Sequence, residues 1–377
     1  MHNTEIKSAV VRIKVIGVGG GGNSVLERIA KENALDIDLI AVNTDAKQLQ
    51  QMTGRGIKTV QIGADITKGL GTGAKFDLGE AAARADVDKI KSMLIGADMV
   101  FITAGMGGGT GTGAAPVIAE IAKDLGILTI GVVNVPFSFE GARKKKIATA
   151  GIEKMQLHMD ALIAVHNDNL LKLQTSKKLS LVNAFEAADG ILKQAIRCIS
   201  ELILTIGVIN VDFADVKSIF QQSASPDALL GIGESSEGAV RAVQLAVTSP
   251  LIEKSLAGAR GIILNISGNE SLSLYEVNEA TKYIYEHTSP DVNIILGTVV
   301  NEKFGDKVRA TIIATDFVDG VIAHPPVSPL AADPVVLEVP KFLGHFAEHP
   351  IDEATGLPKF SLPKNSKIPE FKPDKKE

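Results

Sequence analysis

The sequence predicts an α/β fold with a mostly parallel sheet, a long central helix and a second, smaller α/β domain. In the first half of the chain, short apolar runs alternate with helical patterns, as they do in parallel sheets covered by helices. Glycine-rich stretches separate strand patterns from helix patterns in this half. The chain has 377 residues, of which 45% are hydrophobic, so it is long enough for two domains with separate cores.

The expected strands of the first half are short, apolar and rich in Val and Ile, as buried parallel strands are. They span residues 12–18, 37–43, 98–104, 127–134 and 160–166. A glycine-rich loop is expected over 66–75. The expected helices run from the first glycine loop to about residue 34, over 76–95, over 113–125, and through a lysine-rich segment before the last strand.

A long apolar helix is expected over residues 180–204, followed by a loop at 206–216 that enters a further helix. The long helix is too charged to span a membrane, because it contains Glu186, Asp189, Lys193, Arg197 and Glu201. The second α/β domain is predicted by strands at 261–267, 292–299 and 308–315 and helices at 235–248 and 274–287.

These patterns divide the chain into five parts. We expect one domain at 1–179, the central helix at 180–205 and the second domain at 206–317. Ten of the fifteen prolines lie from Pro325 onward, which predicts an extended linker over 318–366. A short lysine-rich peptide, 367–377, follows it.

Composition argues against several classes of function. A formal net charge of −5 disfavours nucleic-acid binding, and an aromatic content of 4% without Trp disfavours a base-stacking surface. Cys198 is the only cysteine, so we expect a buried structural thiol and no cysteine-rich metal site. No apolar run reaches the roughly 20 residues of a membrane span. We therefore expect a cytoplasmic protein that does not insert into the membrane.

Gly17, Gly19 and Gly22 form the pattern G-x-G-x-x-G between a strand and a helix. This is the fingerprint of Rossmann-like sites, in which a phosphate approaches a helix N-terminus. A nicotinamide-dependent oxidoreductase is therefore one interpretation. It requires an acidic residue at the end of the second strand, but that strand ends AVNTD, with Asp45 beyond it. The motif alone leaves the cofactor open.

The stretch AGMGGGTGTGAAP, at 104–116, contains six glycines at a second strand-to-helix turn. Ordering glycine costs conformational entropy, so a run of six glycines indicates a functional role for the exposed backbone. Successive N–H groups at a helix start form an anion-binding concavity, and Thr110 and Thr112 add hydroxyl donors. We expect Pro116 in the first helical turn. Since hydride transfer does not require a second phosphate cradle, the stretch favours a nucleoside triphosphate.

A P-loop is excluded, because G-x-x-x-x-G-K-[ST] does not occur in the sequence. The nearest stretch is GLGTGAKF, in which Ala74 replaces the second glycine and Phe76 replaces the hydroxyl residue. The phosphates are therefore expected to be held mainly by backbone amides and helix dipoles.

GGGTGTG between a strand and a helix is the signature of tubulin-type proteins. With IKVIGVGGGGNS, PFSFEG and NVDFADV, the chain resembles the tubulin/FtsZ family over roughly residues 12–317, and within it the FtsZ proteins of bacterial cell division. The resemblance implies a GTPase that polymerises head to tail into filaments of the cytokinetic (Z) ring at the division site. It also implies GTP, GDP and Mg²⁺ as ligands.

The resemblance assigns the glycine loops to the nucleotide, with 107–113 on the β- and γ-phosphates. The implied contacts in these loops are Gly20, Gly21, Gly22, Asn23, Asn43, Asp45, Gly71, Thr72, Gly73, Gly107, Gly108, Gly109, Thr110, Gly111, Thr112 and Gly113. Glu140, with Pro136 before it, is similar to the acid that meets the ribose. Family members commonly have Arg four positions later, where this chain has Lys144 after Arg143. Lys cannot make the bidentate contact of Arg, so either residue is expected to meet the phosphates.

Asn167, Phe185 and Asp189 match the base-binding set of the family. Phe185 would stack on guanine, and the Asp189 carboxylate would accept from the guanine N1–H and exocyclic NH₂. Adenine offers no such pair of donors, so GTP is expected over ATP. From the residues alone, Phe185 is equally a core residue and Asp189 a solvent-facing residue of a helix.

Asp212 and Asp215, in NVDFADV, stand three apart at a helix start. From the residues alone they fit helix capping as well as a pair of carboxylates on one face. The resemblance implies that Asn210, Asp212 and Asp215 enter the nucleotide site of the next subunit. There the carboxylates would orient the attacking water, while Mg²⁺ bridges phosphate oxygens. A head-to-tail contact that does not close makes a filament.

The C-terminal peptide 367–377 contains IPEF, which is similar to the family's peptide for membrane-tethering division proteins, although Lys372 stands where Leu is usual. An uninvolved charged tail is the alternative. For the whole chain, the alternatives are a GTP-binding structural polymer with negligible hydrolysis and the NAD-dependent oxidoreductase.

Overall fold

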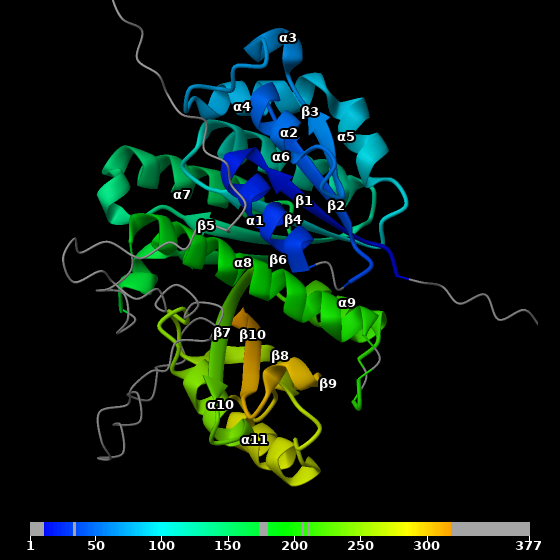
Figure 1. The fold of residues 1–377 in the computed structure, drawn as a ribbon, viewed down its shortest axis with the longest axis vertical. Helices are drawn as coiled ribbons and strands as arrows, with labels where there is room; N and C mark the ends of the chain where they lie inside the picture. The colour runs from blue at the N-terminus through cyan, green and yellow to red at the C-terminus, as the bar shows by residue number, and fades with distance from the viewer. Residues whose placement is uncertain (1–10, 33–34, 173–179, 206, 210, 318–377) are drawn as a thin grey trace, which may run out of the picture.

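The computed structural model describes residues 11–32, 35–172, 180–205, 207–209 and 211–317. Within them, the strands form one sheet in the order β3-β2-β1-β4-β5-β6-β7-β10-β8-β9 (Figure 1). The first six strands are parallel to their neighbours, as expected. They are β1 (Ile13–Val18), β2 (Asp38–Asn43), β3 (Ile57–Gln61), β4 (Met99–Gly105), β5 (Leu128–Val135) and β6 (Ala161–His166).

Helices cover both faces of this parallel part. Along β1, Ile13 and Val15 join a core with the helices of one face, and Ile16 and Val18 join a second core on the other, because strand side chains alternate. The first core is completed by α1 (Gly19–Glu32), α2 (Ala46–Met52) and α8 (Leu181–Leu204). The second is completed by α4 (Phe76–Ala85), α5 (Val87–Leu94), α6 (Gly109–Asp124) and α7 (Ala142–Gln156).

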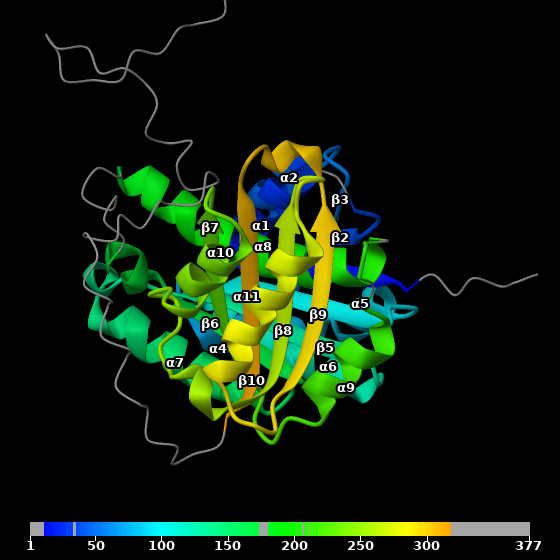
Figure 2. The same cartoon turned by 90° about the horizontal axis from the view of Figure 1, so that it is seen from below.

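α8 lies across the middle of the molecule, and the smaller part follows it in the chain (Figure 1). Its strands are β7 (Asp227–Ser235), β8 (Ala259–Gly268), β9 (Asn293–Val300) and β10 (Val308–Phe317). β10 is antiparallel to both β7 and β8. α9 (Phe213–Gln221) contacts β8, β9 and β10, while α10 (Ala239–Val247) and α11 (Leu274–Glu286) lie in front of the strands in Figure 2. The predicted α/β fold with a smaller second part is confirmed.

The helix expected over 76–95 is wrong, since α4 and α5 are separate helices that meet at Asp86. One carboxylate oxygen of Asp86 accepts from Gly63 N–H at 2.7 Å. The other lies 2.6 Å from the Lys89 ammonium. A short acidic side chain bound to distant backbone competes with the helix, and no local pattern predicts that contact.

The expected start of the second glycine-loop helix is four residues too late. α6 begins at Gly109, so the glycines and threonines form its first turn and Pro116 lies inside it. Glycine is a poor helix former, which is why the local pattern predicts a loop up to residue 113. Without an N–H, Pro116 leaves one helical hydrogen bond unmade.

Four helices and strands were not predicted. Three of them, α2, β3 and the short helix α3 (Ala64–Thr67), follow β2, and α3 overlaps the start of the loop expected at 66–75. β3 is a short edge strand with exposed Lys58 and Thr59. β7 was missed because Gly231 and Gly233 interrupt its pattern. At Gly233 a Cβ would overlap the backbone of α10, so the glycine permits a close helix–strand contact.

Cys198 is fully buried and unpaired, as predicted, and burial raises the pKa of its thiol to about 12. Across the part of the chain that the structure describes, none of the helices combines the length and apolar character needed to cross a membrane. The expected linker 318–366 and peptide 367–377 lie outside the described residues.

We predict that Glu234→Ala lowers the free energy of unfolding by about 3 kcal/mol, because it removes a buried carboxylate from two cations. The Glu234 side chain is 2% exposed and lies 2.9 Å from Arg309 and 3.5 Å from Lys307. The matched control is Glu237→Ala, whose side chain is 77% exposed and 3.8 Å from Arg241. It should change stability by less than about 0.5 kcal/mol. Urea unfolding measures both, and equal midpoints would contradict the prediction.

Candidate functional site

A cavity of about 280 Å³ opens at the carboxyl ends of β1, β2 and β4. This edge is where parallel α/β sheets bind ligands. Of the residues predicted for the site, the lining includes Gly20, Gly21, Asn43, Asp45, Gly71, Thr72, Gly73, Gly108, Gly109, Thr110 and Gly111. The structure therefore brings together residues from separate loops of the chain.

The N-terminus of α6 faces this cavity without a side-chain cap. Its N-cap residue, Gly108, makes no side-chain hydrogen bond to the helix. The Thr112 hydroxyl accepts from Gly107 N–H at 2.8 Å, and the Thr110 hydroxyl bonds the Thr44 hydroxyl at 2.7 Å. Both threonines thus stabilise the loop. Uncapped N–H groups at a helix start, with its dipole, favour an anion.

The two glycine loops lie in contact. Gly19 has φ +70°, and a Cβ there would lie 2.9 Å from Gly111 N. Only glycine combines this left-handed backbone with so close an approach. α1 starts at this residue, so two helix N-termini meet at one cavity.

Of the residues predicted in the glycine loops, Gly22, Asn23, Gly107, Thr112 and Gly113 do not line the cavity. With its amide oriented to satisfy both ends, buried Asn23 donates to the carbonyls of Gly17 and Gly19 and accepts from Asn43 at 2.9 Å. Asn43 also donates to Gln48 at 3.0 Å. These amides fix the first glycine turn.

Asp45 caps α2, where its carboxylate accepts from Gln48 N–H at 3.1 Å. This capping bond accounts for an acidic residue just beyond β2, so no ribose contact is needed to explain it. Asp45 still lines the cavity, and it is the carboxylate of that lining. Among the described residues, no cluster of three metal-ligating side chains occurs.

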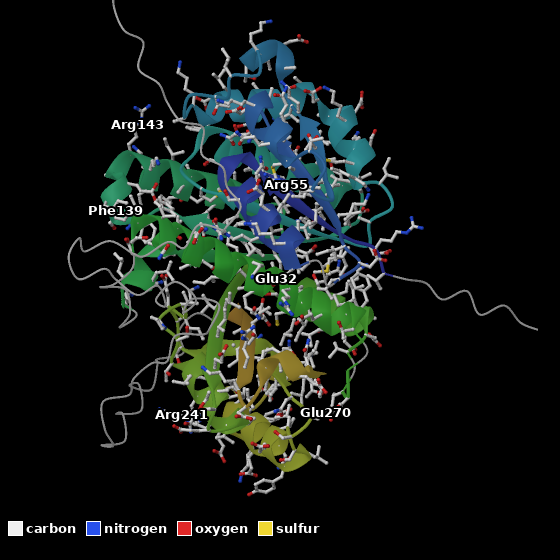
Figure 3. All side chains as sticks on the ribbon, in the orientation of Figure 1. Glu32, Arg55, Phe139, Arg143, Arg241 and Glu270 are labelled. Carbon is white, nitrogen blue, oxygen red and sulfur yellow. The ribbon has the colours of Figure 1, made fainter. Side chains whose placement is uncertain are left out.

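A partly exposed aromatic cluster lies beside the start of α8. Phe185 is 39% exposed and meets buried Phe137 edge to face, with ring centroids 5.4 Å apart. Phe137 stacks on Phe139 at 4.9 Å, and Phe139 is exposed (Figure 3). Phe185 is therefore not a core residue, and its ring is accessible to a planar ligand.

Asp189 lies one helical turn after Phe185 and is mostly buried. Its Oδ2 lies 3.3 Å from Nε of Arg28, and its side chain is 14% exposed. Burial raises the pKa of Asp189 to about 6, against the lowering effect of Arg28. Asp189 is thus not a plain solvent-facing residue. Oδ1 of Asn167, which follows β6, is buried and has no hydrogen-bond partner in the described part of the molecule.

Glu140 is held by its own segment. One carboxylate oxygen accepts from Phe137 N–H at 3.0 Å, and the other lies 2.9 Å from the Lys144 ammonium. Lys144 also packs on the second glycine loop, since a Cβ at Gly107 would lie 2.9 Å from its carbonyl oxygen and 3.3 Å from Pro136. Arg143 is exposed at the start of α7 and points away from the ribbon (Figure 3).

Asp212 is the N-cap of α9, and one of its oxygens accepts from Asp215 N–H at 2.8 Å. The capping interpretation therefore holds for this oxygen. Both side chains are exposed, and the second Asp212 oxygen and the Asp215 carboxylate make no other hydrogen bond to the described residues. Capping leaves them accessible. Asn210 lies outside the described residues.

The structure does not bring Asp212 and Asp215 to the cavity. α8 runs from the aromatic cluster to the segment before α9 (Figure 1). From Phe185 to the end of α8 at Leu204, an α-helix spans roughly 28 Å at ~1.5 Å per residue. The aspartates and the predicted base-binding residues thus lie at opposite ends of one helix.

The sequence prediction missed five lining residues: Val18, Gly19, Gln48, Leu70 and Gly105. A helix start at Asp45 was the available signal for Gln48, because an N-cap aspartate places the third following residue in the first turn. Leu70 is exposed at the rim of the cavity.

Two family models match the chain. The GTPase domain of the Tubulin/FtsZ family matches residues 12–175, and the C-terminal domain of the FtsZ family matches residues 227–318. The two matches cover both sides of the central helix.

Solved structures of similar fold include FtsZ from M. jannaschii. An empty FtsZ dimer is 39% identical, with a TM-score of 0.76, over 81% of this chain and 88% of that one. A point mutant of the same protein is also 39% identical, with a TM-score of 0.77, over 81% and 91%. CetZ2 from Haloferax volcanii, a GTPgS-bound protofilament, is 22% identical, with a TM-score of 0.68 over 82% and 94%. At that identity the likeness concerns the fold alone.

We predict that Gly107→Ala destabilises the protein more than Gly54→Ala. Both glycines have positive φ, +91° and +82°, but a Cβ at Gly107 meets Lys144 and one at Gly54 meets nothing within 4 Å. Gly54→Ala should lower the free energy of unfolding by about 1–2 kcal/mol through left-handed backbone strain. Gly107→Ala should lower it by that amount and by the cost of the Cβ clash with Lys144 as well. Thermal unfolding measures both, and equal melting temperatures would contradict the close approach.

Proposed function

Because the chain belongs to the tubulin/FtsZ family and carries its GTPase domain, we propose that it hydrolyses GTP between subunits of a head-to-tail filament. In this proposal the filament is the scaffold of the cytokinetic ring, at the division site in the cytoplasm. The observation that carries the proposal is the separation of Phe185, the predicted base-binding ring, from Asp212 and Asp215 by the length of α8.

The phosphates of GTP fit the cavity at the N-termini of α1 and α6. Their charge would be held by backbone N–H groups of Gly20, Gly21 and Gly108–Gly111, which line the cavity. Mg²⁺ fits beside them, since the oxygen-bearing residues Asp45, Thr72 and Thr110 also line the cavity. With few protein ligands, Mg²⁺ would be held mainly by phosphates and water. When bound, it would offset phosphate charge.

The base and ribose fit the aromatic side of the site. Phe185 offers an accessible ring, Asp189 a carboxylate for two guanine donors, and Asn167 a buried unpaired oxygen within the described part of the chain. Glu140 would meet the ribose, although both of its oxygens already have partners. Lys144 packs against Gly107, which favours it over Arg143 as the cation nearer the phosphates.

Hydrolysis requires a second copy of the chain. Its Asp212 and Asp215 would orient a water whose oxygen attacks the γ-phosphorus, while the bond to the β,γ-bridging oxygen breaks. The products are GDP and phosphate, and the water's proton leaves through the carboxylates. Each copy then presents a cavity at one end and acids at the other, so the contacts are heterologous and generate a filament.

The nicotinamide alternative loses its support, because Asp45 acts as a helix cap and a second uncapped helix N-terminus occupies the same cavity. The passive polymer without turnover differs only in chemistry and is distinguished by the experiment below. We also propose that peptide 367–377, outside the described residues, binds membrane-tethering division proteins.

We predict that Asp212→Asn and Thr110→Asp are each inactive alone and recover GTPase activity when mixed. Asn caps a helix as well as Asp does, so Asp212→Asn removes the acid and keeps the fold and the cavity. Thr110→Asp places a negative charge in the cavity, which repels the phosphates, but it leaves Asp212 and Asp215 intact. In a mixture, the cavity of the first variant meets the acids of the second. Phosphate release against protein concentration measures the recovery.

Asp215→Asn mixed with Asp212→Asn is the control, since neither partner has a complete acid pair and activity should stay absent. Wild-type activity per subunit should rise with concentration and then level off. Activity that is independent of concentration, with no recovery in the mixture, would place the whole reaction in one subunit. Wild-type protein that binds GTP and releases no phosphate would be the passive polymer.

A further inference from the structure

Three charged side chains join α1 to α8 beside the aromatic cluster. Nε of Arg28 lies 3.3 Å from Oδ2 of Asp189, and its Nη2 lies 3.4 Å from Oε1 of Glu186. α1 starts in the glycine loop of the cavity, and α8 carries Phe185 and Asp189. Arg28 therefore connects the phosphate side of the site to the residue proposed to bind the base.

The two oxygens of Asp189 have different surroundings. Oδ2 accepts from Arg28, whereas Oδ1 makes no hydrogen bond to any residue that the structure describes. A mostly buried carboxylate is costly to keep ionised unless a cation faces it. Arg28 from α1 is that cation, and Glu186, on the same helix as Asp189, acts against it.

The ionised form of Asp189 is the form that accepts both guanine donors. Burial raises its pKa, Arg28 lowers it and Glu186 raises it, and together they bring it to about 6. A carboxyl whose pKa is raised in the folded protein favours folding while protonated and loses that contribution as the pH rises through about 6. Without Arg28, the neutral form would persist nearer to neutral pH and would offer a donor where guanine also offers donors.

We propose that Arg28 is a positioning residue for nucleotide specificity, which holds Oδ2 of Asp189 so that the ionised carboxylate faces the guanine edge. This inference rests on the proposed function. It assigns a role to a residue on a helix otherwise associated with the phosphates.

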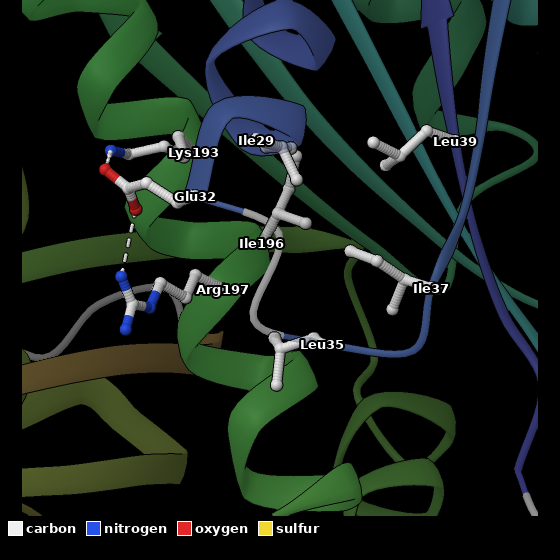
Figure 4. A pocket seen from close by; sticks show the side chains of 8 residues that line it. All are labelled: Ile29, Glu32, Leu35, Ile37, Leu39, Lys193, Ile196 and Arg197. Atoms are coloured by element: carbon white, nitrogen blue, oxygen red, sulfur yellow. Dashed lines mark hydrogen bonds and ion pairs between the residues drawn. The ribbon is translucent and has the colours of Figure 1, made fainter. Parts of the chain in front are cut away.

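A purely structural role for Arg28 is the competing explanation, since it also ties α1 to α8. The same two helices are already joined at the far end of α1, where Glu32 lies 2.6 Å from Lys193 and 3.0 Å from Arg197 (Figure 4). That pair borders a small cavity lined by Ile29, Leu35, Ile37, Leu39 and Ile196. Glu32→Gln therefore provides a control that alters an α1–α8 ion pair without touching the base site.

The experiment measures GDP and inosine diphosphate binding to nucleotide-free protein by calorimetry at pH 7.0 and pH 8.5. GDP avoids hydrolysis, and inosine diphosphate lacks the exocyclic amino group. The variants are Arg28→Met, Arg28→Lys and Glu32→Gln, with thermal unfolding of each as a check on the fold. The phosphate groups of the ligand also change protonation with pH. Each variant is therefore compared with wild type at the same pH, where this effect is equal for both.

Arg28→Met should weaken GDP binding at pH 7.0, by up to about tenfold, because loss of the facing cation raises the pKa of Asp189 and leaves a smaller ionised fraction. The loss should shrink at pH 8.5, where Asp189 ionises in both proteins. Its preference for GDP over inosine diphosphate should also fall. Arg28→Lys keeps the charge without the planar fork, so it should recover most of the binding at pH 7.0, and Glu32→Gln should bind as wild type does.

Wild-type binding by Arg28→Met would overturn the inference. So would a loss that is equal at both pH values and not recovered by Arg28→Lys, because a structural tie has no pH dependence of this kind. Asp189→Ala distinguishes failure of the inferred role of Arg28 from failure of the proposed base site. If it loses GDP while Arg28→Met does not, the base site stands without Arg28, and if it binds GDP normally, the proposed base site itself fails.

Discussion

The site depends on two helix N-termini whose backbone N–H groups are left uncapped at one edge of the sheet. α1 and α6 both begin in glycine loops, and these loops touch at Gly19 and Gly111. The N-cap of α6 is Gly108, which has no side chain to cap it, and the nearby hydroxyls bind elsewhere, Thr112 to Gly107 and Thr110 to Thr44. A concentrated set of free donors at the positive ends of two dipoles is stabilised by an anion. The glycines, the loop geometry and the ligand class all follow from this arrangement.

The second constraint is the length of α8, which separates the residues proposed to bind the base from Asp212 and Asp215. The helix is buried among residues of both parts of the molecule, including Ile263 of β8 and Ile313 of β10, so its ends are fixed relative to each other. In the proposed mechanism, one copy therefore holds two incomplete half-sites. A rigid spacer of this kind explains why the family fold is compatible with chemistry at contacts between copies.

Much of the fold could be predicted from local pattern, and the failures have physical causes. Strands such as Ile13–Val18 are apolar, short and followed by glycine, which defines them without tertiary information. The break at Asp86 depends on Gly63, and β7 contains glycines that only the packing of α10 explains. In the site, the glycine loops were visible in the sequence. Gln48 was missed with α2, although Asp45 was a signal for that helix start. Arg28 was not visible, because it acts through Asp189, which is distant in sequence.

The Asp212 cap has a consequence for how two copies meet. One carboxylate oxygen is already bound to Asp215 N–H, so the side chain is held in a single rotamer before a neighbour arrives. The Asp212 side chain then loses little rotational freedom when two copies associate. The loss of side-chain entropy that usually opposes association is therefore small at this residue. The acid proposed to complete the neighbouring cavity is in this sense pre-organised by the same bond that starts its helix.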